Sequence, residues 1–325
     1  MTKQINTIAV LTSGGDAPGM NAAIRAVVRT ALARGKKVFG INRGYNGLIS
    51  GDIFEMNSKD VSDIIQKGGT VLRTARCKEF ITPEGQKRGA DMCKVFGIDG
   101  LVVIGGDGSF KGAEKLANLG INTIGVPGTI DLDIACTDYT IGFDTAVNTA
   151  MEAIDKIRDT STSHERCSVV EVMGRDAGYI ALWAGIVNGA EAVLLPEKQN
   201  ITQEELIKTI IQNRNKGKKH NLIINAEGSP EDSVKLANRI EEVTGISTRA
   251  TILGHLQRGG SPTAVDRMHA SMMGAYAVDL LCKGKSNRVV AFKEGKYVDY
   301  DIIEALKMQK SISEKRYELS KILSI

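Results

Sequence analysis

The sequence has few cysteines and no long apolar run, and each absence narrows what the protein can be. Its five cysteines among 325 residues form no C-x-x-C pair, and their number is odd. Zinc ribbons, thioredoxin-like redox pairs and a secreted disulfide framework are therefore disfavoured, and a reducing cytoplasm fits best. No stretch approaches the roughly 18 apolar residues of a membrane-spanning helix, and the run Ile8–Leu11 lacks the form of a signal peptide. We expect a soluble cytoplasmic protein with no membrane partner.

Two common phosphate-binding motifs are also missing. None of the Gly-Lys pairs has a glycine five positions before its glycine and a Ser or Thr after its lysine, so there is no P-loop. The dinucleotide fingerprint G-x-G-x-x-G fails as well, since Lys111 stands where a third glycine should follow Gly106 and Gly108. A net charge of only +4 at pH 7 does not demand a nucleic-acid partner. An ordinary P-loop NTPase and a nicotinamide dehydrogenase are disfavoured.

Glycine is what the sequence has in excess, with 35 of 325 residues, above an ordinary share of about 7%. The glycines cluster just after apolar, β-branched runs, where ligands meet the backbone of a parallel sheet. Predicted strands alternate with predicted helices, which indicates α/β architecture, and the length suggests about two domains. We expect strands at 5–12, 37–41, 100–104, 122–126, 168–173, 192–195, 222–225 and 249–253, helices at 20–33, 61–66, 84–96, 145–158, 177–187, 203–212, 232–243 and 264–281, and a hairpin over 288–300.

The segment after the apolar strand Leu101–Ile104 is the first candidate site. Glycines without Cβ let phosphate oxygens reach backbone N–H groups, and the following helix N-terminus favours negative charge. Asp107 at the strand tip is placed to hold Mg²⁺ together with phosphate oxygens. The alternative is a tight turn in which this aspartate merely caps the helix. A second glycine-acidic turn, Gly14–Asp16, favours the phosphate interpretation.

Paired carboxylates and glycine-flanked arginines form a second candidate set. Asp131 and Asp133 are two residues apart, so in an extended segment both would project from one side, and one could serve as a general base. A local Asx turn is the alternative, and it would be preferred for this pair alone. Arg175 and Arg258 lie among glycines that bring ligand and backbone together, although most arginines are solvated.

Taken together, six motifs resemble those of bacterial ATP-dependent 6-phosphofructokinases, in the same order and spacing. They are LTSGGDAPGMNAAIR, KGGTVLRTAR, VVIGGDGS, PGTID, VVEVMGRDAG and ATILGHLQRGGSP. The resemblance implies two three-layer α/β/α domains with mainly parallel sheets. Residues 1–141 plus 256–306 would form a larger ATP-binding domain, and 142–255 plus 307–325 a smaller domain that binds fructose 6-phosphate.

The resemblance further implies transfer of the γ-phosphoryl of ATP to the C1 hydroxyl of fructose 6-phosphate. Asp131 would be the base, Thr129 and Arg175 would hold the phosphoryl, and Asp133 would complete the carboxylate pair. The ATP-binding positions would be Gly15, Arg76, Cys77, Gly106, Asp107, Gly108 and Ser109, with Asp107 on Mg²⁺. The sugar-phosphate positions would be Thr129, Ile130, Asp131, Arg166, Met173, Gly174, Arg175, Glu227, Arg249, His255, Leu256, Gln257 and Arg258. In this family Arg166 and Arg249 would reach across from a neighbouring subunit, usually within a homotetramer.

An effector site for ADP or phosphoenolpyruvate is also implied. Its positions would be Arg25, Arg29, Ser58, Asp63, Arg158, Gly189, Ala190, Glu191, Lys216, Lys218, Lys219 and His220, with Glu191 as a metal-binding acid. Two residues depart from the family pattern. Ser58 replaces an arginine found in many relatives, which predicts a weaker or altered effector response. Leu132 replaces an asparagine between the two carboxylates, and its effect depends on whether the side chain faces the ligand.

Other functions remain open at this point. A pyrophosphate-dependent phosphotransferase is disfavoured because Gly108 and Gly128 stand where such relatives have Asp and Lys. A catalytically silent nucleotide-sensing subunit would not need Asp131 and Arg175. A lipid or NAD kinase shares the GGDG turn but would not need the remaining motifs.

Overall fold

Two mainly parallel sheets organise the chain. The computed structural model describes residues 5–198 and 201–324. It divides into two compact units. Unit 1 comprises the described residues of Met1–Ile130 with Ile134–Thr145 and Arg258–Lys310, and unit 2 comprises Asp131–Asp133 and the described residues of Ala146–Gln257 and Ser311–Ile325. Among the described residues, no helix is long and apolar enough to span a bilayer.

Unit 1 is built on a seven-stranded sheet in the order β11-β10-β5-β4-β1-β2-β3. The strands are β1 (Thr7–Thr12), β2 (Lys37–Ile41), β3 (Ile53–Glu55), β4 (Gly100–Gly105), β5 (Asn122–Pro127), β10 (Arg288–Lys293) and β11 (Lys296–Asp301). Only β2–β3 and β10–β11 pair antiparallel. The three neighbours β1, β4 and β5 run parallel, so their carboxyl ends meet at one edge of the sheet.

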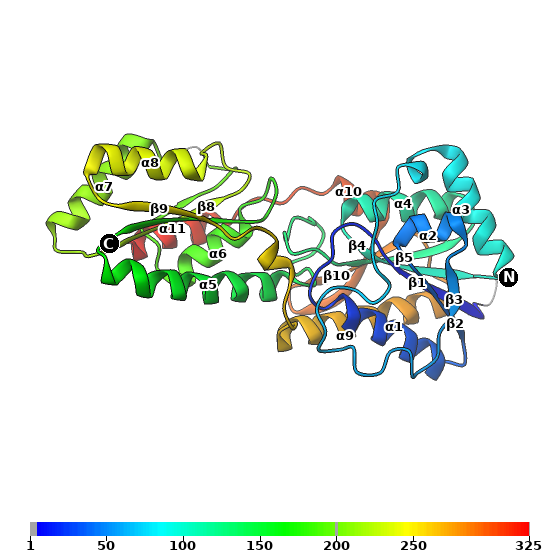
Figure 1. The fold of residues 1–325 in the computed structure, drawn as a ribbon. Coiled ribbons are helices and arrows are strands. Elements are labelled where there is room, and N and C mark those ends of the chain that lie inside the picture. Colours follow the sequence, from blue (N-terminus) through cyan, green and yellow to red (C-terminus); the bar gives the residue numbers. More distant parts are fainter. Residues whose placement is uncertain (1–4, 199–200, 325) are drawn as a thin grey trace. The chain divides into compact units, whose positions relative to one another are not determined.

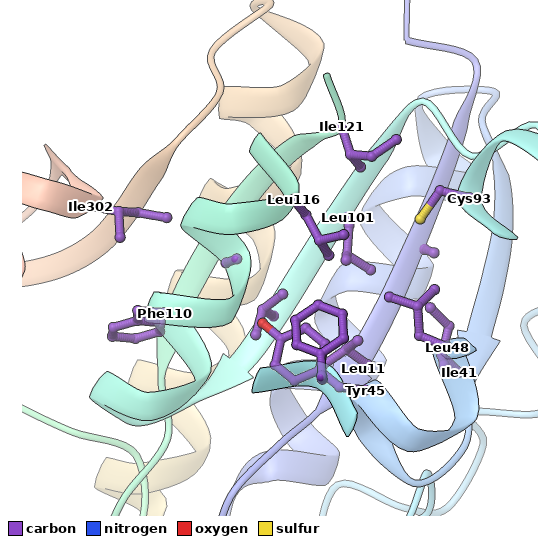
Figure 2. Close-up of a cluster of buried hydrophobic side chains, with 14 of the residues drawn as sticks. Leu11, Ile41, Tyr45, Leu48, Cys93, Leu101, Phe110, Leu116, Ile121 and Ile302 are labelled. Carbon is purple, nitrogen blue, oxygen red and sulfur yellow. The ribbon is translucent and has the colours of Figure 1, made fainter. Parts of the chain in front are cut away.

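Helices cover both faces of this sheet (Figure 1). One face carries α1 (Met20–Ala33) and α9 (Ala264–Cys282), which contact each other. The other carries α2 (Gly44–Ser50), α3 (Pro83–Val95), α4 (Asp107–Asn118) and α10 (Ile302–Lys307), with the short 3₁₀ turn η1 (Glu79–Ile81). Side chains of the sheet and of these helices interlock in the core shown in Figure 2, including Leu11, Leu101, Phe110 and Tyr45. The Tyr45 ring stacks on Phe80 with ring centroids 4.1 Å apart.

Unit 2 is built on a four-stranded parallel sheet in the order β7-β8-β6-β9. The strands are β6 (Cys167–Val172), β7 (Ala192–Leu194), β8 (Asn221–Ala226) and β9 (Thr248–Ile252). The helices are α5 (Phe143–Ser163), whose first residues belong to unit 1, and α6 (Tyr179–Asn188), α7 (Gln203–Asn215), α8 (Ser233–Thr244) and α11 (Glu314–Leu323), with the 3₁₀ turn η2 (Gly254–Arg258). Helices α7 and α8 lie on one face of this sheet, and α5, α6 and α11 lie on the other (Figure 1).

The predicted α/β class with mainly parallel sheets is confirmed, and most predicted elements exist within a few residues of their expected bounds. The helix predicted at Val61–Gln66 is wrong. That segment is a series of turns, because Asp63 takes a left-handed conformation (φ 53°) and each short backbone bond, such as Ser62 N–H to Lys59 O, closes only one turn. Helices α2 and α10 and strand β3 were not predicted.

Candidate active site

Three turns of unit 1 meet at the carboxyl edge of β1, β4 and β5. They begin at Ser13, Gly106 and Gly128. Backbone bonds join them, since Ser13 N–H donates to Ile104 O at 2.9 Å and Gly128 N–H donates to Gly105 O at 3.0 Å. The glycine turns that the sequence singled out separately therefore form one continuous backbone surface.

The glycines of this surface have two different surroundings. A Cβ on Gly105 would collide with the Ser109 side chain and the Ser13 carbonyl, so this glycine allows two turns to pack together. A Cβ on Gly106 or Gly108 would meet no atom within 4 Å. The backbone at these two positions faces open space beside the N-terminus of α4, as a phosphate-binding turn requires.

The segment that contains Arg76 and Cys77 is fastened to the same edge. Thr12 Oγ1 donates to Arg73 O at 2.9 Å, and Thr74 Oγ1 donates to Gly14 O at 2.7 Å. Arg76 is exposed, whereas Cys77 is half-buried and packs against the unit 1 core. These two predicted ATP-binding residues thus follow directly on contacts with the first glycine turn.

Arg258 belongs to the same region of unit 1. Its Nη1 donates to Asp16 O at 3.1 Å. A Cβ on Gly15 would lie 2.5 Å from that nitrogen, so the arginine occupies the space that this glycine leaves. The structure therefore brings Arg258, expected at the sugar phosphate, beside Gly15, expected at ATP.

Asp107 is the first residue of α4 and is exposed. The residue that caps the helix is Gly106, with no side-chain cap, so the alternative of Asp107 as the helix cap is wrong. Among the described residues, no three His, Cys, Asp or Glu side chains cluster as metal ligands. A divalent ion here would need phosphate oxygens to complete its shell, which is the usual mode for Mg²⁺ in kinases.

Asp131 is the most buried of the predicted catalytic side chains. It is 1% exposed, and its Oδ2 lies 3.4 Å from Nε of Arg175, whose side chain is 59% exposed. The two residues come from segments 44 positions apart in sequence, and unit 2 brings them together. A carboxylate and a cation in contact can serve as proton acceptor and charge stabiliser in one site.

The prediction that Asp131 and Asp133 project from one side of an extended segment is wrong. Leu132 between them has φ 56°, a left-handed conformation that breaks the alternation of side chains. The Leu132 side chain is 5% exposed and is thus covered by protein. Asp133 is half-buried. Burial first, and then the charges of Glu197 and Asp133, raise the pKa of Tyr179 to about 12.

The turn that presents Arg175 is tightly built. Gly174 has φ 148° and Arg175 has φ 52°. The N–H groups of Gly174 and Arg175 donate to Glu227 Oε1 at 3.0 and 2.7 Å. Met173 N–H donates to Gln257 Oε1 at 2.8 Å. These residues lie at the carboxyl edge of β6, β8 and β9, where the exposed His255 and Leu256 of η2 also lie.

Arg166 and Arg249 do not join these residues. Arg166 precedes the first residue of β6, and Arg249 is the second residue of β9, at the amino edge of the same sheet. A six-residue strand such as β6 spans about 20 Å at roughly 3.3 Å per residue. Arg249 instead donates to Glu241 Oε2 at 3.0 Å. Within one chain, Arg166 and Arg249 thus lie at the opposite end of this sheet from Arg175.

Part of the predicted effector set gathers at the amino edge of unit 2. The Glu191 side chain is 2% exposed, accepts from Leu222 N–H and lies 2.7 Å from Lys218 Nζ. Arg158 donates to Asn188 O, next to Gly189 and Ala190. Burial lowers the pKa of His220, Glu191 opposes that shift, and Arg158 and Lys218 add to it. Lys219 pairs with Glu165 instead, and Lys216 ends α7.

The remaining predicted effector residues belong to unit 1. Arg25 is half-buried and Arg29 exposed, one turn apart on α1. Ser58 and Asp63 lie in the turns that replace the predicted helix, where Ser62 Oγ donates to Ser58 O at 3.0 Å.

Two buried polar residues that sequence reasoning missed fix the loops of unit 1. Asn21 donates to Lys67 O and Gly68 O and accepts from Val71 N–H at 2.7 Å. Asp266 accepts from Tyr139 OH at 2.5 Å, from Gly142 N–H at 2.6 Å and from Thr145. The only local signal was Thr263 three residues before Asp266, a spacing typical of a helix N-terminus.

Comparisons with known proteins agree with this arrangement. The family model described as "Phosphofructokinase" matches residues 7–281. A curated ATP-dependent 6-phosphofructokinase of Clostridium botulinum strain Hall is 63% identical over 98% of this chain and 100% of its own length. The phosphofructokinase of Saccharomyces cerevisiae superposes with a TM-score of 0.89 at 36% identity, over 98% of this chain and 48% of the yeast chain. A pyrophosphate-dependent phosphofructokinase of Marinobacter aquaeolei shares the fold, with a TM-score of 0.84 at 22% identity over 95% of this chain and 86% of that one.

Proposed function

Because the chain belongs to the phosphofructokinase family, we propose that it is an ATP-dependent 6-phosphofructokinase of glycolysis. It transfers the γ-phosphoryl of ATP to the C1 hydroxyl of fructose 6-phosphate, which gives fructose 1,6-bisphosphate and ADP. The observation that carries this proposal is the 63% identity with an ATP-dependent enzyme over the full length of that relative. Asp131 and Arg175 are both present and form an ion pair. Their presence argues against a catalytically silent, nucleotide-sensing subunit.

ATP binds at the carboxyl edge of the unit 1 sheet in this proposal. The open backbone at Gly106 and Gly108 receives phosphate oxygens, with Gly15, Arg76, Cys77 and Ser109 around it. Asp107 holds Mg²⁺, which neutralises charge on the phosphates when it is bound. An exposed carboxylate in the first turn of α4 fits an ion that takes most of its remaining ligands from phosphate and water.

Asp131 accepts the proton of the C1 hydroxyl, and Arg175 neutralises charge on the phosphoryl group in flight. Positioning and charge neutralisation supply most of the rate enhancement in phosphoryl transfer. Thr129 and Ile130 follow the third turn and lead directly into Asp131. Asp133 is the second acid of this segment, and its part in catalysis stays a prediction.

Fructose 6-phosphate binds at the carboxyl edge of the unit 2 sheet, with Met173, Gly174, Glu227, His255, Leu256 and Gln257 around the sugar. Arg166 and Arg249 lie at the opposite edge of this sheet. They complete the site of a second copy of the chain, so the active form is a homo-oligomer, proposed as a homotetramer in the cytoplasm. No nucleic acid or membrane takes part.

ADP or phosphoenolpyruvate binds the effector positions. Arg158, Lys218 and His220 supply positive or proton-binding groups around the buried Glu191. Arg25 and Arg29 supply cations from α1. Ser58 supplies no charge, so the response is weaker than with an arginine there. Introducing Ser58→Arg should strengthen it, and an unchanged effector response would contradict this role.

Pyrophosphate is the alternative phosphoryl donor. The fold does not decide between donors, because a pyrophosphate-dependent relative shares it. The open space at Gly108 supports ATP, since a side chain there would fill it. Gly128 gives less support, because its Cβ would point at Ile104 and Met20, 3.0 and 3.2 Å away.

Initial rates with each donor across a range of fructose 6-phosphate concentrations test the proposal. ATP should support turnover, and inorganic pyrophosphate should not. Turnover with pyrophosphate alone would replace the proposed donor, and no turnover with either would remove the proposed activity.

A further inference from the structure

Glu227 makes two contacts that sugar binding does not require. Its Oε1 accepts from two successive backbone N–H groups, those of Gly174 and Arg175, at 3.0 and 2.7 Å. Two neighbouring N–H groups that converge on one anion form a nest, which is stabilised by negative charge. Here the anion is a side chain of the same unit.

The turn held by this carboxylate is strained. Arg175 has φ 52°, in the left-handed region that is unfavourable for residues with a Cβ. The turn is also tightly packed against Gly228, because a Cβ on Gly228 would collide with the Arg175 carbonyl. Such conformations persist only where surrounding contacts impose them.

Arg175 is the side chain that this turn presents to Asp131, with 3.4 Å between Nε and Oδ2. We propose that Glu227 is a positioning residue for Arg175: its carboxylate holds the backbone of the turn so that the guanidinium meets Asp131 and the phosphoryl group. This inference rests on the proposed function for the role of Arg175, and it assigns Glu227 a task besides sugar contact. Among the described residues, Glu227 Oε2 has no hydrogen bond, so one oxygen is left for a ligand.

Two substitutions distinguish the hydrogen bonds that Glu227 accepts from the negative charge of its carboxylate. Glu227→Gln keeps an oxygen that can accept both N–H groups, although without the charge that strengthens them. Glu227→Ala removes both bonds and leaves the nest to water. Glu204→Ala is the matched control, because it removes an exposed carboxylate of unit 2, on α7, that is not the acceptor of the Gly174 and Arg175 N–H groups.

Amide hydrogen exchange at Gly174 and Arg175 is the first readout, and it needs no substrate. Exchange at these amides should accelerate about tenfold or more in Glu227→Ala, stay near wild type in Glu227→Gln and remain unchanged in the control. Unchanged exchange in Glu227→Ala overturns the proposal. A wild-type enzyme that fails to phosphorylate fructose 6-phosphate would remove the proposed function but leave this readout decisive.

A double-mutant cycle is the second readout. Misplacement of a catalytic group by about 1 Å can cost about 10²-fold, so Glu227→Ala should lower kcat by about that factor. In an Arg175→Ala background the same change should lower kcat by less than about threefold, because the group it positions is gone. Equal losses of kcat in both backgrounds, or a rise in the KM for fructose 6-phosphate with kcat intact, would show Glu227 to be a sugar ligand alone.

Discussion

The carboxyl edges of the two sheets occupy equivalent places in their units but are built differently. In unit 1, Gly106 and Gly108 present bare backbone to open space. In unit 2, Gly174 and Gly228 are crowded by carbonyl groups, and the side chains of Glu227 and Gln257 hold the turn. The first edge suits a ligand recognised through backbone N–H groups, and the second suits one met by a few fixed side chains.

Gly106 and Gly108 at the first edge leave open space, whereas Gly174 and Gly228 at the second edge leave room for the protein's own backbone. Substitutions at the first edge should therefore affect mainly ligand binding, and those at the second edge mainly stability or the position of Arg175.

Arg175 at the second edge should give the largest effect. One cation on a transferring phosphoryl group contributes about 10³–10⁵-fold, so Arg175→Ala should lower kcat by at least the smaller factor. Steady-state kinetics with ATP and fructose 6-phosphate would measure it, with Glu204→Ala as the control. A loss of kcat of less than tenfold would mean that Arg175 does not stabilise the transferring phosphoryl group.

A substitution of Arg166 tests whether the amino edge of the unit 2 sheet contributes to the active site of a second copy of the chain. Arg166→Ala should raise the KM for fructose 6-phosphate by about tenfold or more, because a charged contact to phosphate is lost. Mixed and reassembled with inactive Asp131→Asn chains, and assayed far below the KM of Arg166→Ala, it should give roughly a quarter of the wild-type rate, since about that share of sites combines an intact Asp131 with an intact Arg166. Mixtures that give no more than the Arg166→Ala rate diluted by inactive chains would contradict a shared site.

A pair of glycine substitutions contrasts the two edges directly. Gly108→Ala should leave the free energy of unfolding unchanged or slightly higher, because its Cβ meets nothing and alanine favours the helix. It should also raise the KM for ATP about tenfold where the phosphates approach the backbone. Gly228→Ala should lower the free energy of unfolding by about 1–3 kcal/mol through overpacking. Urea unfolding would measure the stability of both variants, and steady-state kinetics would measure their KM for ATP. Equal losses of unfolding free energy in the two variants would contradict the difference between the two edges.

His220 should give the smallest effect. Its pKa in the folded chain lies below the usual 6.5, mainly because the ring is partly buried. Between these two values the unfolded chain binds more protons, so stability should fall as the pH drops through 6.5 toward the folded pKa. His220→Asn should flatten this dependence slightly between pH 8 and pH 5.5 in thermal melts while kcat is unchanged. A steeper dependence in the variant would reverse the assigned sign.

Local signals were enough to predict most of the fold. Strand β4 is six consecutive buried residues closed by glycine, and α1 matches its predicted bounds, Met20–Ala33. The Val61–Gln66 helix failed because a left-handed Asp63 overrode an apolar spacing. Residue types and spacing favoured a phosphate site only for the glycine turns, whereas the roles of Asp131 and Arg175 came from the resemblance to phosphofructokinases.

Contacts between distant segments could not be predicted. Asp266 holds Gly142 across 124 positions, and Gln257 holds Met173 across 84. No local pattern marks such a pair, because each partner is chosen by the packing of the finished unit. The left-handed conformation of Leu132, which breaks the alternation of side chains between Asp131 and Asp133, could not be predicted for the same reason.

The role of Asp131 is the central claim, and Asp131→Asn tests it most directly when turnover and calorimetric binding of fructose 6-phosphate are measured on the same sample. Loss of a general base lowers kcat by about 10²–10⁴-fold, and we expect that loss with sugar-phosphate affinity within a few-fold of wild type. Turnover close to wild type would contradict the account, because the buried carboxylate beside Arg175 would then not take the proton.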